Sequence, residues 1–384
     1  MGIDLSVSFT GVRFPNPFVL ASAPPTESET NILRAFDAGW GGVVTKTIGL
    51  HPVVNVAGPK TKFLRQHDSG VLSMNKGRQG VLHSSWNWEL ISDKPLDWWL
   101  PRLTRIKRAH PERALIASIM AGSGSDEELA HWRTLAQGCQ EAGADGLELN
   151  LSCPHMDRPD MGANIGRDRE LCSFVVQAVR EVARVPVWAK LTPATADIVV
   201  EAAAVFRGGA DAVSSSNTWP SLPLVDIDRL EFEIEVDGFV SSGGLGGPAI
   251  LPLSLAKMAQ MARAFPEKAF SGIGGVSEFA HALNYFLLGC GTVQVCTAAM
   301  LDQAVGPHVI ARLVAGYREF LERHADRGWT QLEHFRGLLR DRVIEQARIR
   351  RPGHTEYHGG YVAQEGYASP EADEAVPPAP SGTR

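Results

Sequence analysis

The chain has 384 residues, a length that fits one large α/β domain with extensions. Its formal net charge of −6 argues against a basic surface for nucleic acid, and its 44% of hydrophobic residues is typical of a globular protein. No apolar run is long enough to cross a bilayer, and the N-terminal residues lack the features of a secretory signal, so we expect no membrane partner. The five cysteines are scattered, which favours a reducing cytoplasm. No two of them are separated by two residues, so no segment offers the closely spaced thiolates of an iron–sulfur cluster.

Eight short apolar stretches predict β-strands, because near-continuous apolar runs are typical of parallel strands buried on both faces. In chain order they lie at 17–21, 43–44, 114–120, 147–149, 186–191, 212–213, 268–273 and 293–295. Amphipathic stretches between them predict helices at roughly 27–38, 126–142, 168–184, 196–208, 250–264, 277–288 and 303–324. A glycine ends several of these helices, for example at Gly39 and Gly143, where it suits the left-handed C-cap.

The alternation of eight strands with helices predicts a (β/α)8 TIM barrel formed by residues 1–325. A doubly wound open sheet is the structural alternative, but no Gly-x-Gly-x-x-Gly turn follows the first strand. After the barrel we expect a helical extension over 326–351 and a disordered tail over 352–384. Two segments, 50–111 and 219–246, are too long for ordinary loops. Both follow the C-terminal ends of strands, where barrel enzymes place substrate-binding elements.

Two lysines, Lys46 and Lys190, stand at the ends of predicted strands and should face the C-terminal end of the barrel. An ammonium group there can neutralise charge that builds up on a bound cofactor, or it can form a Schiff base. Each lysine could instead pair with a carboxylate at the rim of the barrel. Their position on two different strands favours one shared anionic ligand.

Candidates for phosphate binding follow the last two strands. Gly274 and Gly275 follow the seventh strand, and Cys296 and Thr297 follow the eighth, where barrels commonly bind phosphate through backbone N–H groups. A Gly-Gly turn lets the backbone approach a ligand closely, although the same pair could form a plain tight turn. For Cys296 we expect the backbone, rather than the thiol, to face the phosphate.

Polar and reactive side chains follow the fourth and sixth strands. Asn150, Asn217 and Thr218 could read the alternating C=O and N–H edge of a pyrimidine, or the asparagines could serve only to shape turns. Cys153 lies in a Ser-Cys-Pro turn, where a thiol with a pKa of about 8.5 can exchange a proton with carbon. The alternative for Cys153 is a small buried hydrophobic residue. His155 could assist at the site or order the turn.

The segment Asn150-Leu151-Ser152-Cys153-Pro154-His155 resembles the catalytic loop of dihydropyrimidine dehydrogenases. Dihydroorotate dehydrogenases have a similar loop but typically carry Asn in place of His155. Further segments resemble this pyrimidine family in order, from about Ile3 to about Leu321. They are Asn16-Pro17-Phe18, Ala21 to Pro24, Thr45-Lys46-Thr47, Asn87 to Ser92, Leu115 to Met120, Ala189 to Pro193, Asn217-Thr218 and Gln294-Val295-Cys296.

The resemblance implies an FMN cofactor and a reaction at the C5–C6 bond of a pyrimidine ring. It places the flavin against Ser22, Lys46, Thr47, Lys190, Gly247, Gly274, Gly275, Cys296 and Thr297. It places the ring against Asn87, Asn150, Ser152, Asn217 and Thr218, with Cys153 as the general acid or base. Hydride would pass between flavin N5 and ring C6, while Cys153 exchanges the proton at C5.

The chain also departs from this family in ways that leave its substrate and electron partner open. The family's iron–sulfur domains have no counterpart here, so we expect a separate reductase subunit that carries FAD and iron–sulfur clusters, and also a homo-oligomer. The segments 156–160 and 226–237 diverge from the family. The alternatives are a dihydroorotate dehydrogenase, a flavoprotein acting on another unsaturated ring, a Schiff-base aldolase or lyase that uses Lys46 or Lys190, and a non-catalytic flavin-binding subunit.

Overall fold

The structure is a computed structural model, and it describes residues 2–74, 80–153, 158, 160–344 and 349. Pro154, His155 and the predicted tail over 352–384 lie outside these residues. The chain divides into two units, Met1–Arg340 and Asp341–Arg384, and the first contains the elements described below. Among the described residues, no helix is both long and apolar enough to span a bilayer.

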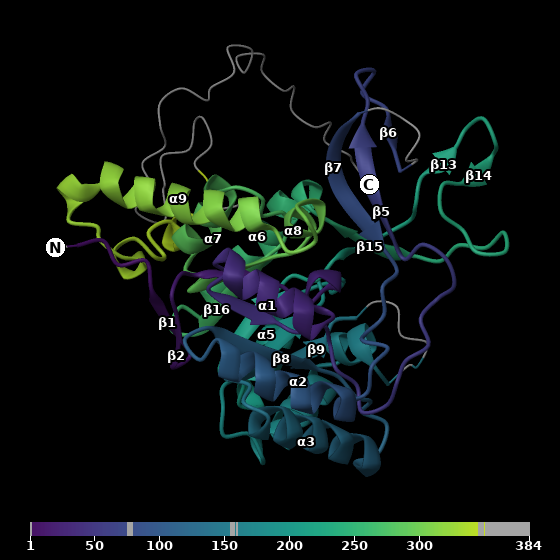
Figure 1. Ribbon diagram of the computed structural model, residues 1–384, viewed down its shortest axis with the longest axis horizontal. Coiled ribbons are helices and arrows are strands. Elements are labelled where there is room, and N and C mark those ends of the chain that lie inside the picture. Colours follow the sequence, from purple (N-terminus) through teal and green to yellow (C-terminus); the bar gives the residue numbers. More distant parts are fainter. Residues whose placement is uncertain (1, 75–79, 154–157, 159, 345–348, 350–384) are drawn as a thin grey trace, which may run out of the picture. The chain divides into compact units, whose positions relative to one another are not determined.

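Eight parallel strands close into a barrel, as the sequence predicts (Figure 1). They are β3 (Phe18–Leu20), β4 (Gly42–Val44), β8 (Ala114–Ile119), β9 (Gly146–Leu151), β10 (Val187–Leu191), β11 (Ala212–Ser215), β16 (Ala269–Ile273) and β17 (Thr292–Val295). Each strand pairs with the next in this order, and β17 pairs with β3 to close the ring. Lys190 of β10 pairs with Asn150 of β9, so two predicted site residues lie at the same level of the barrel.

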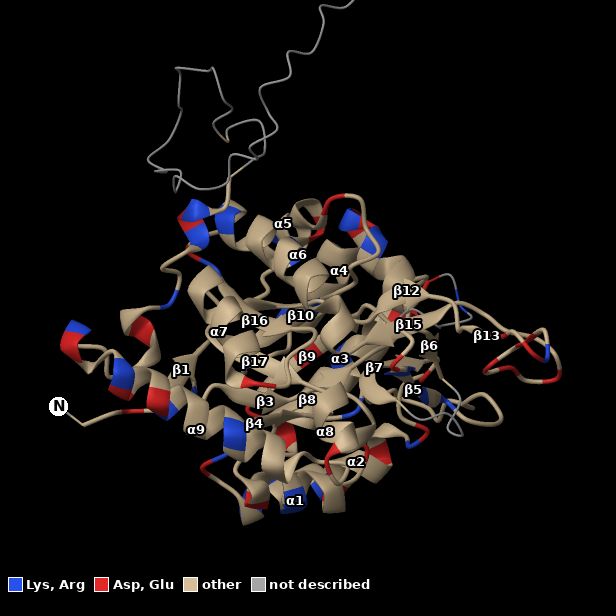
Figure 2. Cartoon of the chain, turned by 90° about the horizontal axis from the view of Figure 1, so that it is seen from above, with Lys and Arg blue, Asp and Glu red and all other residues tan. Residues whose placement is uncertain are grey.

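Helices surround the barrel, as Figure 2 shows from above, and charged residues lie both on them and on the connecting loops. They are α1 (Glu29–Ala38), α2 (Leu96–Ala109), α3 (Asp126–Glu141), α4 (Arg169–Arg180), α5 (Ile198–Arg207), α6 (Leu251–Ala264), α7 (Phe279–Leu288), α8 (Thr297–Leu301) and α9 (Pro307–Arg323). Gly39 ends α1 with φ at 109°, and Gly289 ends α7 with φ at 113°. This left-handed conformation suits glycine, because a side chain there would be strained.

Helix α2 is the main element that the sequence analysis missed, since it lies inside the segment 50–111. Its buried residues recur at helical spacing and are Leu96, Trp99, Leu103 and Ile106. Pro101 inside the helix conceals the pattern, because proline is usually excluded from helix interiors. The helix fills the position between β4 and β8 that every strand-to-strand connection of such a barrel requires.

The two long segments form one antiparallel sheet rather than two separate loops. From the first come β5 (Thr61–Gln66), β6 (Leu72–Ser73) and β7 (Val81–Asn87), and from the second come β12 (Trp219–Ser221) and β15 (Gly243–Gly246). The order in the sheet is β12-β15-β7-β5-β6, so β15 of the second segment pairs directly with β7 of the first. A small apolar cluster supports the sheet and consists of Leu64, Met74, Trp86, Trp88 and Ile234. A short hairpin, β13 (Val225–Asp226) with β14 (Glu231–Phe232), extends from the second segment.

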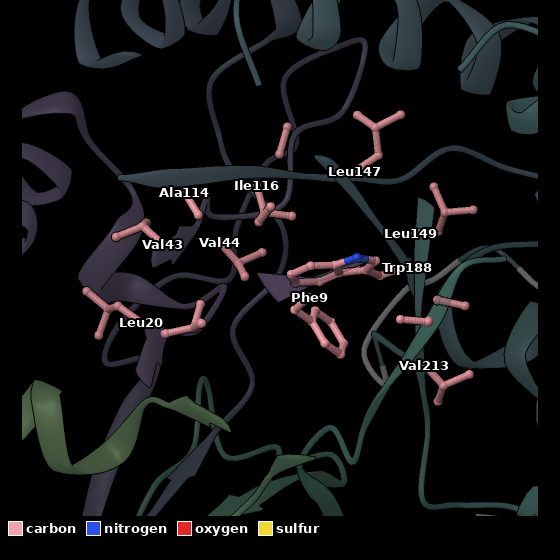
Figure 3. Packing of buried hydrophobic residues seen from close by; sticks show 14 of the residues in the cluster. Phe9, Leu20, Val43, Val44, Ala114, Ile116, Leu147, Leu149, Trp188 and Val213 are labelled. Atoms are coloured by element: carbon pink, nitrogen blue, oxygen red, sulfur yellow. The ribbon is translucent and has the colours of Figure 1, made fainter. Parts of the chain in front are cut away.

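A hairpin of β1 (Val7–Phe9) and β2 (Val12–Phe14) packs against the barrel strands. Phe9 contacts Trp188 edge-on with ring centroids 5.0 Å apart, and Figure 3 shows the two rings side by side among apolar residues of the barrel. The Trp188 indole donates a hydrogen bond of 2.9 Å to the Thr10 hydroxyl. Trp188 lies two residues before Lys190 on β10, so this packing covers the opposite end of the barrel from the site.

Candidate active site

One cavity opens at the C-terminal ends of the barrel strands, beneath the sheet formed by the two long segments. Its empty space is about 1000 Å³, which includes solvent at its mouth. Of the residues that the sequence analysis assigned to the site, those that line the cavity are Ser22, Lys46, Thr47, Asn87, Asn150, Cys153, Lys190, Asn217, Thr218, Gly247, Gly274, Gly275, Cys296 and Thr297. Ser152 is the exception. The strand-end pattern and the family resemblance together therefore identified residues that line a single cavity.

Both strand-end lysines reach the cavity and both also pair with a carboxylate. Lys46 Nζ lies 3.2 Å from Glu89 Oε2, and Lys190 Nζ lies 3.9 Å from Glu148 Oε1. The lysines are nearly buried, with 6% and 4% of their surface exposed. A buried ammonium group is stable only beside such a counter-charge. The two interpretations of these lysines, a rim salt bridge and a shared ligand site, are thus compatible.

A hydrogen-bond network fixes the two predicted asparagines on neighbouring walls of the cavity. Asn150 Nδ2 donates to Thr47 Oγ1 at 2.9 Å, and Asn150 Oδ1 accepts from the Ser152 hydroxyl at 3.0 Å. Asn217 Nδ2 donates to Ser152 Oγ at 2.9 Å, and its Oδ1 accepts from the Thr218 backbone N–H at 2.8 Å. Ser152 therefore joins the two amides from outside the cavity wall, and the ring contact that the resemblance implies for it stays a prediction.

The first long segment contributes a carboxylate that the sequence analysis did not single out. Glu89 lines the cavity beside Asn87, whose Oδ1 accepts the Glu89 backbone N–H at 3.3 Å. Its carboxylate accepts a hydrogen bond of 3.2 Å from the Thr61 hydroxyl, besides its ion pair with Lys46. The available signal was its place two residues after Asn87, within a segment that already resembled the family. Ser85 of β7 was also not predicted. It lines the cavity and forms a hydrogen bond of 2.8 Å with the Thr297 hydroxyl.

The turn after β16 can be built only with glycine. Gly274 and Gly275 have φ of 129° and 77°, which L side chains rarely adopt. A Cβ atom on Gly274 would lie 2.4 Å from Ser254 Oγ, and one on Gly275 would lie 2.6 Å from Leu251 Cβ. The turn therefore presents bare backbone to the cavity, which is what close approach of a phosphate requires.

The cysteines differ in their surroundings. Cys153 is 5% exposed and lines the cavity, and its carbonyl accepts the Ala163 backbone N–H at 2.9 Å. Burial raises the pKa of the Cys296 thiol to about 11, although Lys190 and Lys46 oppose the shift. Cys296 therefore stays a protonated thiol near neutral pH, in line with the expectation that its backbone is the part that matters. The predicted contribution of His155 lies outside the described residues.

Comparison with known proteins agrees with this geometry. A family model described as dihydroorotate dehydrogenase matches residues 4–317. The chain is 37% identical over 343 residues to the chloroplastic dihydropyrimidine dehydrogenase (NADP(+)) of Arabidopsis thaliana, an alignment that covers 87% of this chain and 76% of that protein. It is 36% identical over 344 residues to the NAD-dependent dihydropyrimidine dehydrogenase subunit PreA of Escherichia coli strain K12, covering 89% and 78%. It is 32% identical over 335 residues to the catalytic subunit of dihydroorotate dehydrogenase B (NAD(+)) of Thermococcus kodakarensis, covering 87% and 97%.

These relatives are named as oxidoreductases, which argues against a Schiff-base aldolase as the interpretation of the two lysines. The matched region contains the whole barrel, both long segments and every residue of the cavity wall. The resemblance seen in the sequence is confirmed, and the chain belongs to the dihydroorotate dehydrogenase family of oxidoreductases, within which it is similar to the dihydropyrimidine dehydrogenases.

Proposed function

We propose that the cavity binds FMN and that the enzyme oxidises or reduces the C5–C6 bond of a pyrimidine-like ring. The observation that carries this proposal is that one cavity brings a thiol together with side-chain amides and ammonium groups, namely Cys153 with Asn87, Asn150, Asn217, Lys46 and Lys190. The names of the two dihydropyrimidine dehydrogenase relatives support the same substrate class.

The cavity wall fits FMN in both charge and backbone shape. The buried ammonium groups of Lys46 and Lys190 would stabilise negative charge on the flavin ring. The bare backbone at Gly274 and Gly275 would hold the phosphate, where a side chain would collide with the helix behind the turn. When bound, FMN supplies a hydride donor or acceptor. Further contacts to it are assigned to Ser22, Thr47, Gly247, Cys296 and Thr297.

The amides would recognise the ring through its alternating carbonyl and N–H groups. Asn150 and Asn217 are held by the Ser152 hydroxyl, so their orientation is set before a ligand binds. Asn87 and Thr218 complete this set on the side of the long segments. Preorganised polar groups of this kind select a substrate strongly, because a ring that lacks a partner leaves a buried group unpaired.

Cys153 would hold the proton that is exchanged at C5 of the ring. A thiol can deliver this proton at carbon in the direction of reduction and remove it in the direction of oxidation. The sheet of the two long segments forms part of the same cavity wall through Ser85, Asn87 and Gly246. Ala163 anchors the backbone of Cys153 through its N–H group.

A dihydroorotate dehydrogenase is the second candidate, favoured by the family match and the Thermococcus relative. A carboxylated ring needs a cation of its own. Among the described residues of the cavity wall, the cations are Lys46 and Lys190, and both already have carboxylate partners. Glu89, the partner of Lys46, lies on the same wall. An uncharged ring such as uracil therefore fits this wall better than orotate.

A separate reductase subunit with FAD and iron–sulfur clusters is the electron partner that we propose. The chain has no dinucleotide-binding Gly-x-Gly-x-x-Gly turn after its first strand and no closely spaced cysteines. The Escherichia coli relative is itself named as a subunit. The isolated chain should therefore turn over slowly with NADH or NADPH, and rapid turnover with either would refute the need for a partner.

The decisive experiment combines cofactor uptake with substrate choice. The purified chain is supplied with FMN, the excess is removed, and the bound flavin is quantified by its absorbance. The reduced flavoprotein is then mixed with uracil, thymine or orotate, and the rate of flavin reoxidation is measured without oxygen. Reoxidation by uracil or thymine would support the proposal. Failure to bind FMN would refute it, and reoxidation by orotate alone would establish the second candidate.

A further inference from the structure

The two cavity lysines differ in where their carboxylate partners lie. Glu89, the partner of Lys46, lines the cavity and can meet a ligand there. Glu148, the partner of Lys190, is fully buried with 0% of its surface exposed, and it does not belong to the cavity wall. A residue that no ligand can reach cannot bind substrate or cofactor directly. Any influence of Glu148 on the reaction must act at a distance, through its own charge and through its hold on Lys190.

Glu148 lies in a polar layer inside the barrel, directly below the cavity. Its Oε2 atom accepts hydrogen bonds from Ser214 Oγ at 2.7 Å and from Gln294 Nε2 at 2.8 Å. These residues come from β11 and from β17, which stands opposite β9 in the ring, so the three side chains meet in the interior. Its Oε1 atom has no hydrogen-bond partner among the described residues and lies 3.9 Å from Lys190 Nζ.

A buried polar layer is not the most stable way to fill the interior of a barrel. Apolar side chains of similar volume are usually as stable as a buried ion pair or more stable, so the pair is weak evidence for a purely structural role. The register places Glu148 level with Trp188 on β10, two residues below Lys190. The Oε2 atom of Glu148 thus accepts two hydrogen bonds, and Oε1 lies on the side of the Lys190 ammonium group.

We propose that Glu148 is a positioning residue that holds the Lys190 ammonium at the cavity floor and partly neutralises its charge, and thereby sets how strongly a bound flavin is stabilised in negatively charged forms. This inference rests on the FMN site of the proposed function. Removing the Glu148 carboxylate should increase the stabilisation of negatively charged forms of the bound flavin, whereas simple structural damage would decrease it.

Sulfite is a suitable probe, because it adds reversibly to oxidised flavins and binds more tightly as positive charge near the flavin increases. Glu148→Gln should lower the Kd for sulfite about tenfold, the effect of one unit charge acting over roughly 10 Å in an effective dielectric near 20. Lys190→Gln should raise it by a larger factor, because Lys190 lines the cavity and lies nearer the flavin than Glu148. The double variant, which lacks both charges, should bind sulfite more tightly than Lys190→Gln. Ser214→Ala is the matched control, since it removes a hydrogen bond to Glu148 but no charge.

The outcomes separate the possibilities. Unchanged or weaker sulfite binding in Glu148→Gln, with normal FMN content, would overturn the inference. If Glu148→Gln yields no folded flavoprotein, the double variant is compared with Lys190→Gln, and tighter sulfite binding by the double variant is still required. The titration needs bound FMN but no substrate. A wild-type protein that binds FMN but acts on no pyrimidine would therefore refute only the proposed substrate, whereas one that takes up no FMN would refute both.

Discussion

At the scale of single residues, the cysteines differ in the pKa of the thiol and in their access to the cavity. Burial raises the pKa of Cys296 to about 11, and of Cys139 and Cys172 to about 12. Since the thiolate is the reactive form, these three are poor nucleophiles near neutral pH. Cys153 and Cys296 both line the cavity with the asparagines, and the raised pKa of Cys296 leaves Cys153 as our candidate for proton exchange.

Replacing Cys153 tests this assignment directly. Cys153→Ala should still bind FMN and the ring, because we assign both contacts to other residues, while turnover falls about 10²–10⁴-fold. Cys153→Ser should retain more activity in reduction than in oxidation, since a hydroxyl gives up a proton less readily than a thiol. Steady-state rates per bound flavin, measured with the melting temperature of each variant, provide the test. Near-normal turnover in Cys153→Ala, or a loss explained by lower stability alone, would contradict the role.

At the scale of elements, the turn after β16 depends on glycine for two separate reasons, its φ and its packing. Gly275→Ala should weaken FMN binding at least about tenfold, because the added methyl group lies 2.6 Å from Leu251 Cβ and must displace either the turn or helix α6. Gly238→Ala is the matched control, because Gly238 has φ of 78°, close to the 77° of Gly275, but no atom within 4 Å of the added Cβ. The control should cost about 1 kcal/mol in stability and leave the Kd for FMN unchanged. Equal FMN affinity in the two variants would show that the turn does not contact the cofactor.

The pairing of β15 with β7 should matter more for the substrate than for the cofactor. A Cβ atom on Gly243 would lie 2.1 Å from Trp86 Cζ2 and 2.8 Å from the Asn87 carbonyl oxygen. Gly243→Ala should therefore shift Asn87 and raise KM for the ring more than Kd for FMN. Ser241→Ala, at an exposed position of the same segment, is the control. A variant with unchanged KM and intact sheet would show that Asn87 is not a ring contact.

The sequence predicted the barrel and the strand-end part of the cavity wall because both follow local rules, whereas Asn87 and Gly247 were taken from the family resemblance. Buried parallel strands are apolar runs, and the residues that end them must meet at one edge of the ring. The sheet of the two long segments could not be predicted from local sequence patterns, because Gly244 pairs with Asn87 across more than a hundred intervening residues. Glu89 was overlooked for the same reason, since the sheet and not a barrel strand places it in the cavity.

At the scale of the whole molecule, the fully buried thiols link stability to alkaline pH. Burial raises the pKa of Cys139 and Cys172 from an ordinary value near 9 to about 12. The unfolded chain therefore releases these protons first, so the stability from the protonated thiols is complete below pH 9 and is lost as pH rises toward 12. By pH 10 the loss is about 1.4 kcal/mol for each thiol. Urea unfolding of Cys139→Ala and wild type at pH 8 and pH 10 should show a smaller decrease in the variant, and an equal decrease would contradict the assignment.

The shared sheet of the two long segments also bears on how this enzyme could change over time. Strand β7 belongs to the segment before α2, and β15 belongs to a segment far downstream, yet each supplies the hydrogen-bonding edge of the other. Grafting either segment alone from a relative would leave an exposed strand edge, and such edges promote aggregation. The two segments therefore depend on each other structurally. A change of substrate by recombination would require both to be exchanged together, whereas point substitutions on the cavity side of the sheet could alter specificity one residue at a time.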